Sequence, residues 1–182
     1  MNSRQRQALL LELIDQLRRH DSWCGETHIQ KSTYFLQELA GVPLDFNFIF
    51  YSYGPYSFDL NDAITALRCD RLVTVKPRDP YGASLLPSES AQRFLDCYPK
   101  TRQTHGADIR FVAAKFGKKK VAELERLATA LYVQLESPDG TAKELAVEIH
   151  RLKPHVTVEQ ARSALAWVDG LREELKEHST SD

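Results

Sequence analysis

Cysteine and histidine are the residues of this sequence whose side chains could act as a nucleophile or hold a metal. Cys24 and His28 could be a nucleophile and its base, but no third group is placed to orient the histidine. Cys69 and Cys97 lie far along the chain, and the six histidines show no HExxH or comparable ligand spacing. Three separated cysteines cannot all be bridged, which fits a reducing compartment. We therefore expect free thiols, no metal site and no cofactor.

Motifs that mark common enzyme classes are missing from the sequence. The 182 residues contain no GxSxG, no P-loop, no GxGxxG and no recognisable pair of catalytic carboxylates. Apolar residues make up 42% and charged residues 27% of the chain, which is ordinary for a soluble globular protein, and no apolar run is long enough to span a bilayer. We predict a cytoplasmic protein without catalytic activity. An unrecognised nuclease or hydrolase stays open as an alternative.

A cluster of basic residues stands out against the net charge of −1. Between Pro99 and Lys120 there are seven lysines and arginines and a single acidic residue, Asp108. Such a segment is either a solvated connector or a surface for a partner. Nucleic acid is the partner that these charges would suit, with contacts from the lysines at its C-terminal end. These are Lys115, Lys118, Lys119 and Lys120.

The stretch FNFIFYSYGPYSFDLNDAI, residues 46–64, gathers seven aromatic residues around one Gly-Pro pair. Gly54 can adopt backbone angles closed to other residues and Pro55 fixes φ, so we expect the chain to turn there from an extended segment into a helix. A tyrosine hydroxyl from this stretch should bond the second helix, for example at Gln30 or Lys31, and clamp the two segments together. The phenylalanines lack a polar group and are expected in the core: Phe46, Phe48, Phe50 and Phe58.

Periodicity and capping signals predict helices and a hairpin in the first half of the chain. Helices are expected over residues 4–19, from a Thr27–Gln30 capping box to Gly41, and from a cap at Ser57. The segments RLVTV and ASLLP flank the turn KPRDPYG as two strands, and a fourth helix begins at Ser88. This order is close to the winged-helix plan. The helix in the recognition position carries Asp59 and Asp62, whose charges disfavour contact with DNA phosphates.

The last third of the sequence predicts three amphipathic helices. Leucines recur at helical spacing from residue 121, and capping boxes at Thr141–Glu144 and Thr157–Gln160 begin the next two helices. The predicted fold is therefore mainly α (α+β), with a winged-helix-like half followed by a three-helix unit. The boundaries are 1–98 for the first half, 99–117 for the basic connector, 118–176 for the three-helix unit and 177–182 for a disordered tail.

Two motifs resemble a known group of proteins. THIQKSTYFLQEL followed by FYSYGPYSFDLNDAI resembles the Panacea (SocA-like) antitoxin-associated domain, and more closely the YwgA-like family of uncharacterised bacterial and archaeal proteins. LATALYVQL and IHRLKPHVTVEQARSAL also look YwgA-like, so the resemblance runs from about Leu9 to Leu171. Ser32 departs from the leucine of the family, and Glu26 from its basic residue. The motif positions form a partner-binding or structural site at Gln30, Lys31, Tyr34, Tyr53, Gly54, Pro55, Tyr56 and Ser57.

The resemblance implies a function in protein contact. Panacea domains are mostly antitoxins that neutralise a toxin by binding it, and some act as adaptors for proteolysis. We therefore expect a non-catalytic regulator with a protein partner, antitoxin-like or defence-associated, and no association with membranes. A winged-helix regulator that binds nucleic acid through residues 99–120 stays open, as do the identity of the partner and the oligomeric state.

Overall fold

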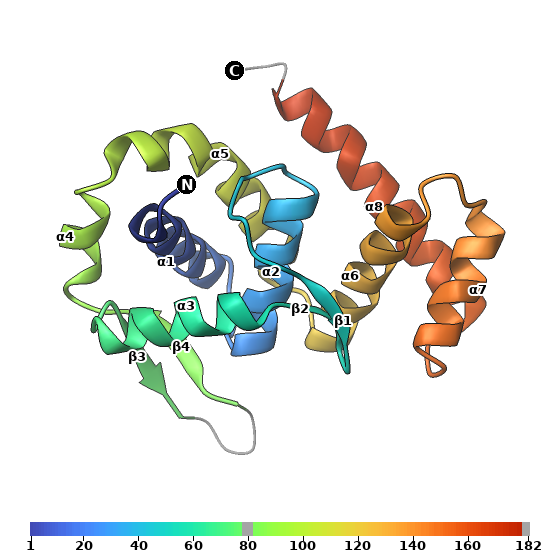
Figure 1. The fold of residues 1–182 in the computed structure, drawn as a ribbon, viewed down its shortest axis with the longest axis horizontal. Helices are drawn as coiled ribbons and strands as arrows, with labels where there is room; N and C mark the ends of the chain where they lie inside the picture. Colours follow the sequence, from blue (N-terminus) through green and yellow to red (C-terminus); the bar gives the residue numbers. More distant parts are fainter. Residues whose placement is uncertain (78–81, 180–182) are drawn as a thin grey trace.

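Eight helices and two short antiparallel strand pairs make up the described part of the chain, residues 1–77 and 82–179 of the computed structural model (Figure 1). The predicted mainly α, α+β class is confirmed. The elements are α1 (Ser3–Arg19), α2 (Glu26–Glu38), β1 (Ile49–Tyr51), β2 (Gly54–Tyr56), α3 (Phe58–Cys69), β3 (Val73–Lys76), β4 (Ser84–Pro87), α4 (Ala91–Leu95), α5 (Pro99–Phe116), α6 (Val121–Glu136), α7 (Ala142–Leu152) and α8 (Val158–Ser179).

The first half contains the expected succession of three helices and a hairpin. Helix α1 begins at an Asn2 capping box and buries a leucine stripe, and α3 begins where the Ser57 hydroxyl accepts the amide of Leu60 at 3.2 Å. Strands β3 and β4 pair from Val73 opposite Pro87 to Lys76 opposite Ser84. The amide of Leu85 donates to the Cys24 carbonyl at 3.0 Å, which ties this hairpin to the α1–α2 loop. The predicted turn KPRDPYG lies partly outside the described residues.

Three local predictions in this half are wrong. The turn expected at Gly54–Pro55 lies at Ser52–Tyr53, and Gly54 and Pro55 belong to strand β2, which pairs with β1. Helix α2 begins at Glu26 with Gly25 as its N-cap, so Thr27 does not cap it; the Gln30 side chain instead bonds Ser57 in a distant segment. The fourth helix begins later than the predicted Ser88, since Ser90 is the N-cap of α4 and Ala91 its first residue.

The extended segment expected before Gly54 is paired as a strand only from Ile49, where β1 starts. The backbone of Phe46 has no strand partner because its amide and carbonyl both bond the Gln37 side chain, each at 2.9 Å.

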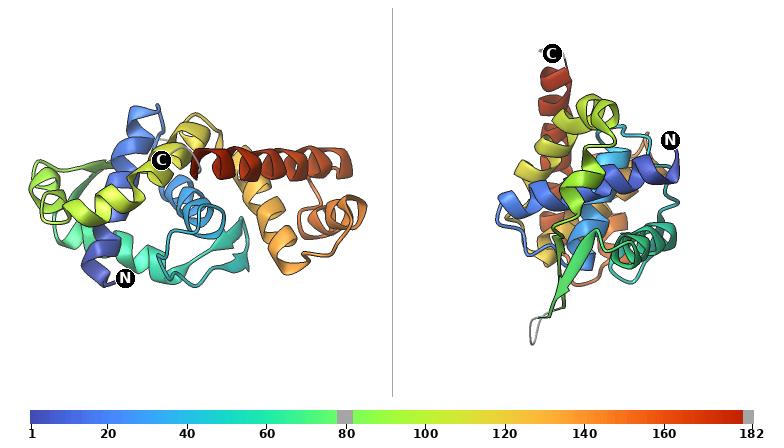
Figure 2. Two further views of the ribbon diagram at one scale, coloured as in Figure 1. Left: turned by 90° about the horizontal axis from the view of Figure 1, so that it is seen from above. Right: turned by 90° about the vertical axis from the view of Figure 1, so that its left-hand side faces the viewer.

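The basic segment 99–117, expected to be a connector, is for the most part helix α5. It packs along α1, and Figure 2 shows the two helices lying beside each other at one end of an elongated molecule. Ile109, Val112 and Ala113 are fully buried. Arg102 donates to Glu12 of α1 at 2.8 Å. The segment is thus part of the core of the first half, with its basic side chains on the outer face.

Helices α6, α7 and α8 form the expected three-helix unit. The Thr141–Glu144 capping box is present, and the Thr157 hydroxyl accepts the Gln160 amide at 3.1 Å. Helix α8 ends at Ser179, and residues 180–182 of the predicted tail, 177–182, lie outside the described residues. Within the described ranges, no helix combines the length and apolar character needed to cross a membrane.

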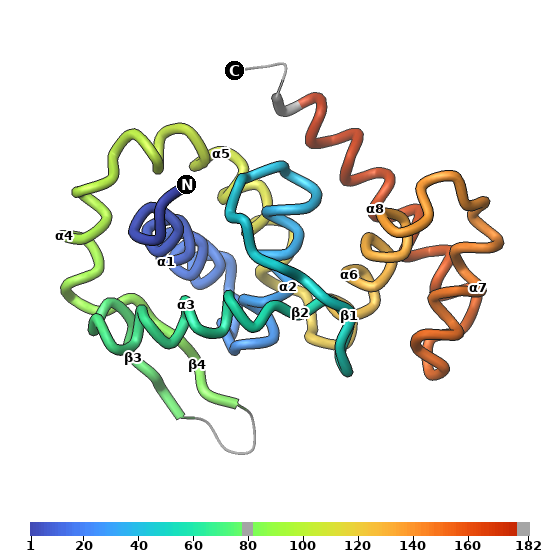
Figure 3. Tube along the Cα trace, viewed as in Figure 1, coloured from blue at the N-terminus to red at the C-terminus, as the bar shows by residue number. Residues whose placement is uncertain are grey.

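One core runs through both halves of the molecule. The Phe116 ring of α5 stacks on Phe35 of α2, with ring centroids 4.1 Å apart, and meets the Trp167 ring of α8 edge-on at 5.5 Å. Helix α2 also packs against α6. The tube in Figure 3 shows α2 and α6 at the centre, between α1 and the last two helices. The two halves therefore share apolar contacts that neither could make alone.

Replacement of Phe116 by alanine tests this shared core. Phe116→Ala should lower the free energy of unfolding by about 3–5 kcal/mol, because the fully buried ring leaves a cavity at the junction. Urea denaturation followed by tryptophan fluorescence and by far-UV circular dichroism should give coincident transitions in the wild type and in the variant. Two separated transitions in the wild type would contradict a common core.

Candidate functional site

The β1–β2 hairpin, which carries the Gly-Pro motif, is held by side chains that bond its backbone. The Lys31 ammonium donates to the Pro55 carbonyl at 2.8 Å, and the Lys153 ammonium donates to the Ser52 carbonyl at 2.8 Å. The Gln30 amide bonds Ser57 twice, donating to its carbonyl at 2.9 Å and accepting from its amide at 3.1 Å. Gln30 and Lys31 of α2 and Lys153, the C-cap of α7, thus fix the turn of the hairpin, strand β2 and the start of α3.

A tyrosine contributes to this clamp, as expected, but from a more exposed position. The Tyr56 hydroxyl donates to the Glu26 carboxylate at 3.3 Å, so the hairpin touches α2 there rather than at Gln30 or Lys31. Burial raises the pKa of Tyr56, and the adjacent Glu26 charge acts in the same direction. The hydroxyl therefore stays protonated as the donor of this bond.

Lys31 is the most deeply buried lysine or arginine among the described residues, with only 1% of its surface exposed. Burial lowers its pKa to about 8, against the opposing effect of Glu125 and with a further lowering by Lys153. Its only bond to a described group is to the Pro55 carbonyl. A residue so enclosed holds the fold together and cannot meet a partner.

The predicted motif residues therefore divide into two groups. The structure buries Gln30, Lys31, Tyr34, Gly54, Pro55 and Ser57. Tyr53, by contrast, is 65% exposed, and Tyr56 is half-buried. The first group builds the hairpin's support, and the second group lies on the surface that the hairpin presents.

The exposed side of this hairpin carries a cluster that we call the aromatic surface. Tyr51, Tyr56 and Phe58 contact one another, with centroids 5.1–6.0 Å apart. Phe58, expected in the core, is 54% exposed because it occupies the first position of α3 on its outer side. The complete surface comprises Tyr51, Tyr56 and Phe58, the exposed Ile49 and, at the hairpin turn, Tyr53, whose ring centroid lies 5.8 Å from the Lys153 ammonium.

The other phenylalanines of the motif lie under this surface. Phe46 is buried, whereas Phe48 and Phe50 are half-buried. Phe48 meets Tyr34 edge-on at 5.0 Å, and Phe50 meets Tyr132 of α6 at 5.1 Å. The expectation of core positions therefore holds fully for Phe46 alone, which precedes β1, and in part for Phe48, which packs against the core from a partly buried position.

The basic residues proposed for nucleic acid are mostly paired with carboxylates. Lys115 forms an ion pair with Glu174, Lys118 lies 3.6 Å from Asp21, and Lys119 lies 2.6 Å from Glu123. The Lys119 ammonium also lies 4.5 Å from the Trp167 ring centroid. Lys120 forms no ion pair with any described residue. The four lysines do not form one continuous cationic strip, because Lys115 and Lys119 turn toward acidic partners.

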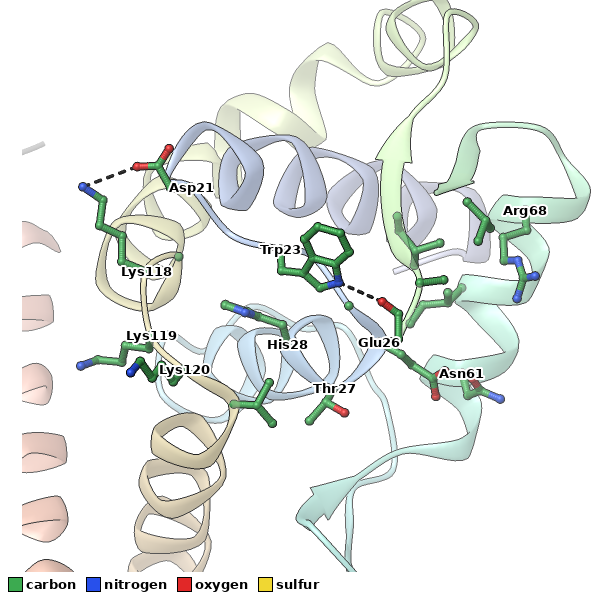
Figure 4. Close-up of a pocket in the computed structure, with 18 of the residues that line it drawn as sticks. Asp21, Trp23, Glu26, Thr27, His28, Asn61, Arg68, Lys118, Lys119 and Lys120 are labelled. Atoms are coloured by element: carbon green, nitrogen blue, oxygen red, sulfur yellow. Dashed lines mark hydrogen bonds and ion pairs between the residues drawn. The ribbon is translucent and has the colours of Figure 1, made fainter. Parts of the chain in front are cut away.

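A groove that the sequence did not indicate opens next to these lysines, and we call it the α2–α3 groove. It has a volume of about 790 Å³ and lies between the N-terminus of α2, helix α3, the β3–β4 hairpin and the α5–α6 junction. Figure 4 shows Trp23 and His28 in its middle, Lys118 and Lys120 on one side, and Asn61 and Arg68 on the other. No local motif could reveal it, since four distant segments form it.

His28 closes the inner wall of this groove. Its Nε2 lies 3.1 Å from the Phe116 carbonyl, which can only accept, so Nε2 carries the proton. Nδ1 then accepts from the Ser22 hydroxyl at 3.2 Å, and the Ser22 oxygen accepts the Cys24 amide at 2.9 Å. Burial lowers the pKa of His28 to about 4, against the effect of the Phe116 bond. The imidazole is neutral and joins α2 to the end of α5.

The Cys24–His28 pair considered as a nucleophile and base is not assembled. The Cys24 thiol points to the Ile14 carbonyl, 3.5 Å away, and burial raises its pKa to about 11. His28 bonds Ser22 instead. Cys24, Cys69 and Cys97 are all unbridged, and within residues 1–77 and 82–179 no three His, Cys, Asp or Glu side chains are grouped so that they could hold a metal.

Comparison with known proteins adds no assignment, because neither a protein-family model nor a curated protein matches the chain. The resemblance to YwgA-like and Panacea proteins therefore stays an expectation from the motifs.

Gly54 can be tested as the residue on which the hairpin turn depends. Its φ of +90° lies in the region that glycine alone adopts readily, and an added Cβ would lie 3.0 Å from the Thr129 hydroxyl. Gly54→Ala should therefore lower the free energy of unfolding by about 1–3 kcal/mol. Gly170→Ala, in an open position of α8, is the control and should raise stability by about 1 kcal/mol. Equal effects of the two changes in urea denaturation would refute this role.

The neutral state of His28 predicts a pH dependence of stability. The unfolded chain takes up a proton at this residue near pH 6.5, but the folded protein does so only near pH 4, so stability falls as pH drops through this window. Between pH 6.5 and about pH 5 the loss from this residue should be about 2 kcal/mol.

His28→Gln should remove that part of the pH dependence, whereas His155→Gln, at an exposed position, should retain it. The measurement is urea denaturation at several pH values across this range. The same pH dependence in the wild type and in His28→Gln would show that the imidazole is not held neutral.

Proposed function

We propose that this protein is a non-catalytic regulator that binds another protein through the aromatic surface. The observation that carries the proposal is the mutual contact of Tyr51, Tyr56 and Phe58, of which Tyr51 and Phe58 are exposed, with Ile49 and Tyr53 exposed on the same hairpin. Exposed apolar patches on soluble domains commonly mark interaction sites, and tyrosine is enriched among residues that dominate binding energy.

The rigidity of the hairpin supports this role. Its backbone is fixed at Ser52, Pro55 and Ser57 by side chains from other helices. A partner would therefore not have to order the loop on binding, which removes one of the costs that weaken protein association.

The charges around the aromatic surface suit a protein better than a nucleic acid. Asp59 and Asp62 are exposed on α3 directly after Phe58, where a phosphate backbone would be repelled. The resemblance to Panacea antitoxins suggests the class of partner, a toxin or effector protein inside a prokaryotic cell. On this proposal the chain works antitoxin-like, by covering a surface of its partner.

Nucleic-acid binding is the second candidate, because Lys118 and Lys120 are exposed on one side of the α2–α3 groove. Loss of counterions on such binding would make it steeply sensitive to salt. This candidate is weaker because Lys115, Lys118 and Lys119 have carboxylate partners within the chain.

Affinity capture from the native host tests the proposal. The wild type should retain a specific protein, and a Tyr53→Ser/Phe58→Ser variant should retain at least about tenfold less of it, since exposed aromatic anchors are removed without disturbing the core. Val147→Ser removes an equally exposed apolar side chain from α7 and should leave capture unchanged.

Both protein and nucleic acid in the captured material should be identified. Retention of the same protein by the Tyr53→Ser/Phe58→Ser variant would contradict the proposed surface. Salt-sensitive shift of duplex DNA that is lost in Lys118→Glu/Lys120→Glu would instead favour the second candidate.

A further inference from the structure

The α2–α3 groove adjoins the aromatic surface. Glu26 lines the groove, and its carboxylate accepts the Tyr56 hydroxyl at the edge of the aromatic surface. A protein bound to the tyrosines therefore has the groove within reach. The groove itself is built from residues that the aromatic surface does not use.

The floor of the groove is apolar. Trp23 lies in its middle, held by a bond from its indole nitrogen to the Gly82 carbonyl at 3.0 Å. The buried side chains of Ile64 and Leu85 also line the groove. Val75 and Val121 extend this floor toward solvent, where Val121 is 46% exposed. The volume of about 790 Å³ is within the range of sites that enclose a ligand rather than a single side chain.

The rim of the groove is mainly cationic, with positively charged side chains on two opposite sides. Lys118 and Lys120 project from the α5–α6 junction, and Arg68 projects from the last turn of α3 (Figure 4). Arg68 and Lys120 are exposed and form no ion pair with a described residue. A ligand that complements this rim carries negative charge at two separated points with an apolar group between them.

We propose that the α2–α3 groove binds an acidic, extended peptide segment of the protein partner. Its carboxylates would pair with Lys120 and Arg68, and an apolar side chain between them would cover Trp23. Asp21 and Glu26 also line the groove. A phosphate backbone, charged at every nucleotide, would meet these two carboxylates, whereas a peptide can place neutral residues opposite them. The inference that the segment belongs to the same partner rests on the proposed function.

A degenerate library of peptides about ten residues long, a length suited to an extended strand in such a site, tests the groove with the full chain as bait. The wild type should select sequences with Asp or Glu on both sides of Leu or Phe, and the selected peptides should bind more weakly at high salt. Arg68→Glu/Lys120→Glu should bind those peptides at least about tenfold more weakly and should select Lys and Arg instead. A reversal of preference cannot arise from misfolding.

Two controls separate the groove from its surroundings. Arg93→Glu/Lys143→Glu makes the same change in net charge at exposed positions outside the groove and should select the acidic peptides as the wild type does. Tyr53→Ser/Phe58→Ser should also bind them normally. If the wild type selects acidic peptides but Tyr53→Ser/Phe58→Ser captures the host protein as well as the wild type does, the proposed function is contradicted. The proposal for the groove is then still supported.

Three outcomes overturn the proposal. The first is that the wild type selects no excess of Asp or Glu from the library, and the second is that Arg68→Glu/Lys120→Glu selects the same acidic peptides as the wild type. The third is that an oligothymidylate binds the groove more tightly than the best acidic peptide does. The last outcome would assign the groove to single-stranded nucleic acid, with Trp23 as a stacking face.

Discussion

The bond from the Lys31 ammonium to the Pro55 carbonyl is the interaction on which the rest of the arrangement depends. A buried charge is costly unless it has a partner, and the Pro55 carbonyl is the bond acceptor that the described residues offer it. If the β1–β2 hairpin lifted away, this ammonium would lose its acceptor. The hairpin is therefore locked against α2, and α6 closes the same space from the other side through Thr129 and Glu125.

This constraint links the core to both surfaces. With the hairpin locked, Ser57 is fixed by Gln30 and begins α3 at a defined place, which sets Phe58 outside and Ile64 and Arg68 along the groove. On the opposite wall, His28 fixes the end of α5 through the Phe116 carbonyl. The aromatic surface and the groove are thus two faces of one rigid region around α2.

The structural features that the sequence predicts correctly are those determined by interactions between residues close together in the chain. The caps at Ser57, Thr141 and Thr157 involve residues within three positions, and the two capping boxes were read from the sequence alone. The predicted capping box at Thr27 is absent because the Gln30 side chain, which would have completed it, bonds the backbone of Ser57, 27 residues further along the chain. The outward position of Phe58 and the groove could not be foreseen for the same reason, since both depend on which helices pack behind the hairpin.

The bonds that hold the β1–β2 hairpin end on its backbone at Ser52, Pro55 and Ser57, whereas the aromatic surface consists of its outward side chains. Folding and recognition are thereby assigned to different atoms of the same short segment. Tyr51 and Phe58 form none of these supporting bonds, so substitutions at these two positions leave the bonds intact. Related chains could therefore diversify these positions rapidly and acquire new binding specificities while the scaffold beneath them stays unchanged.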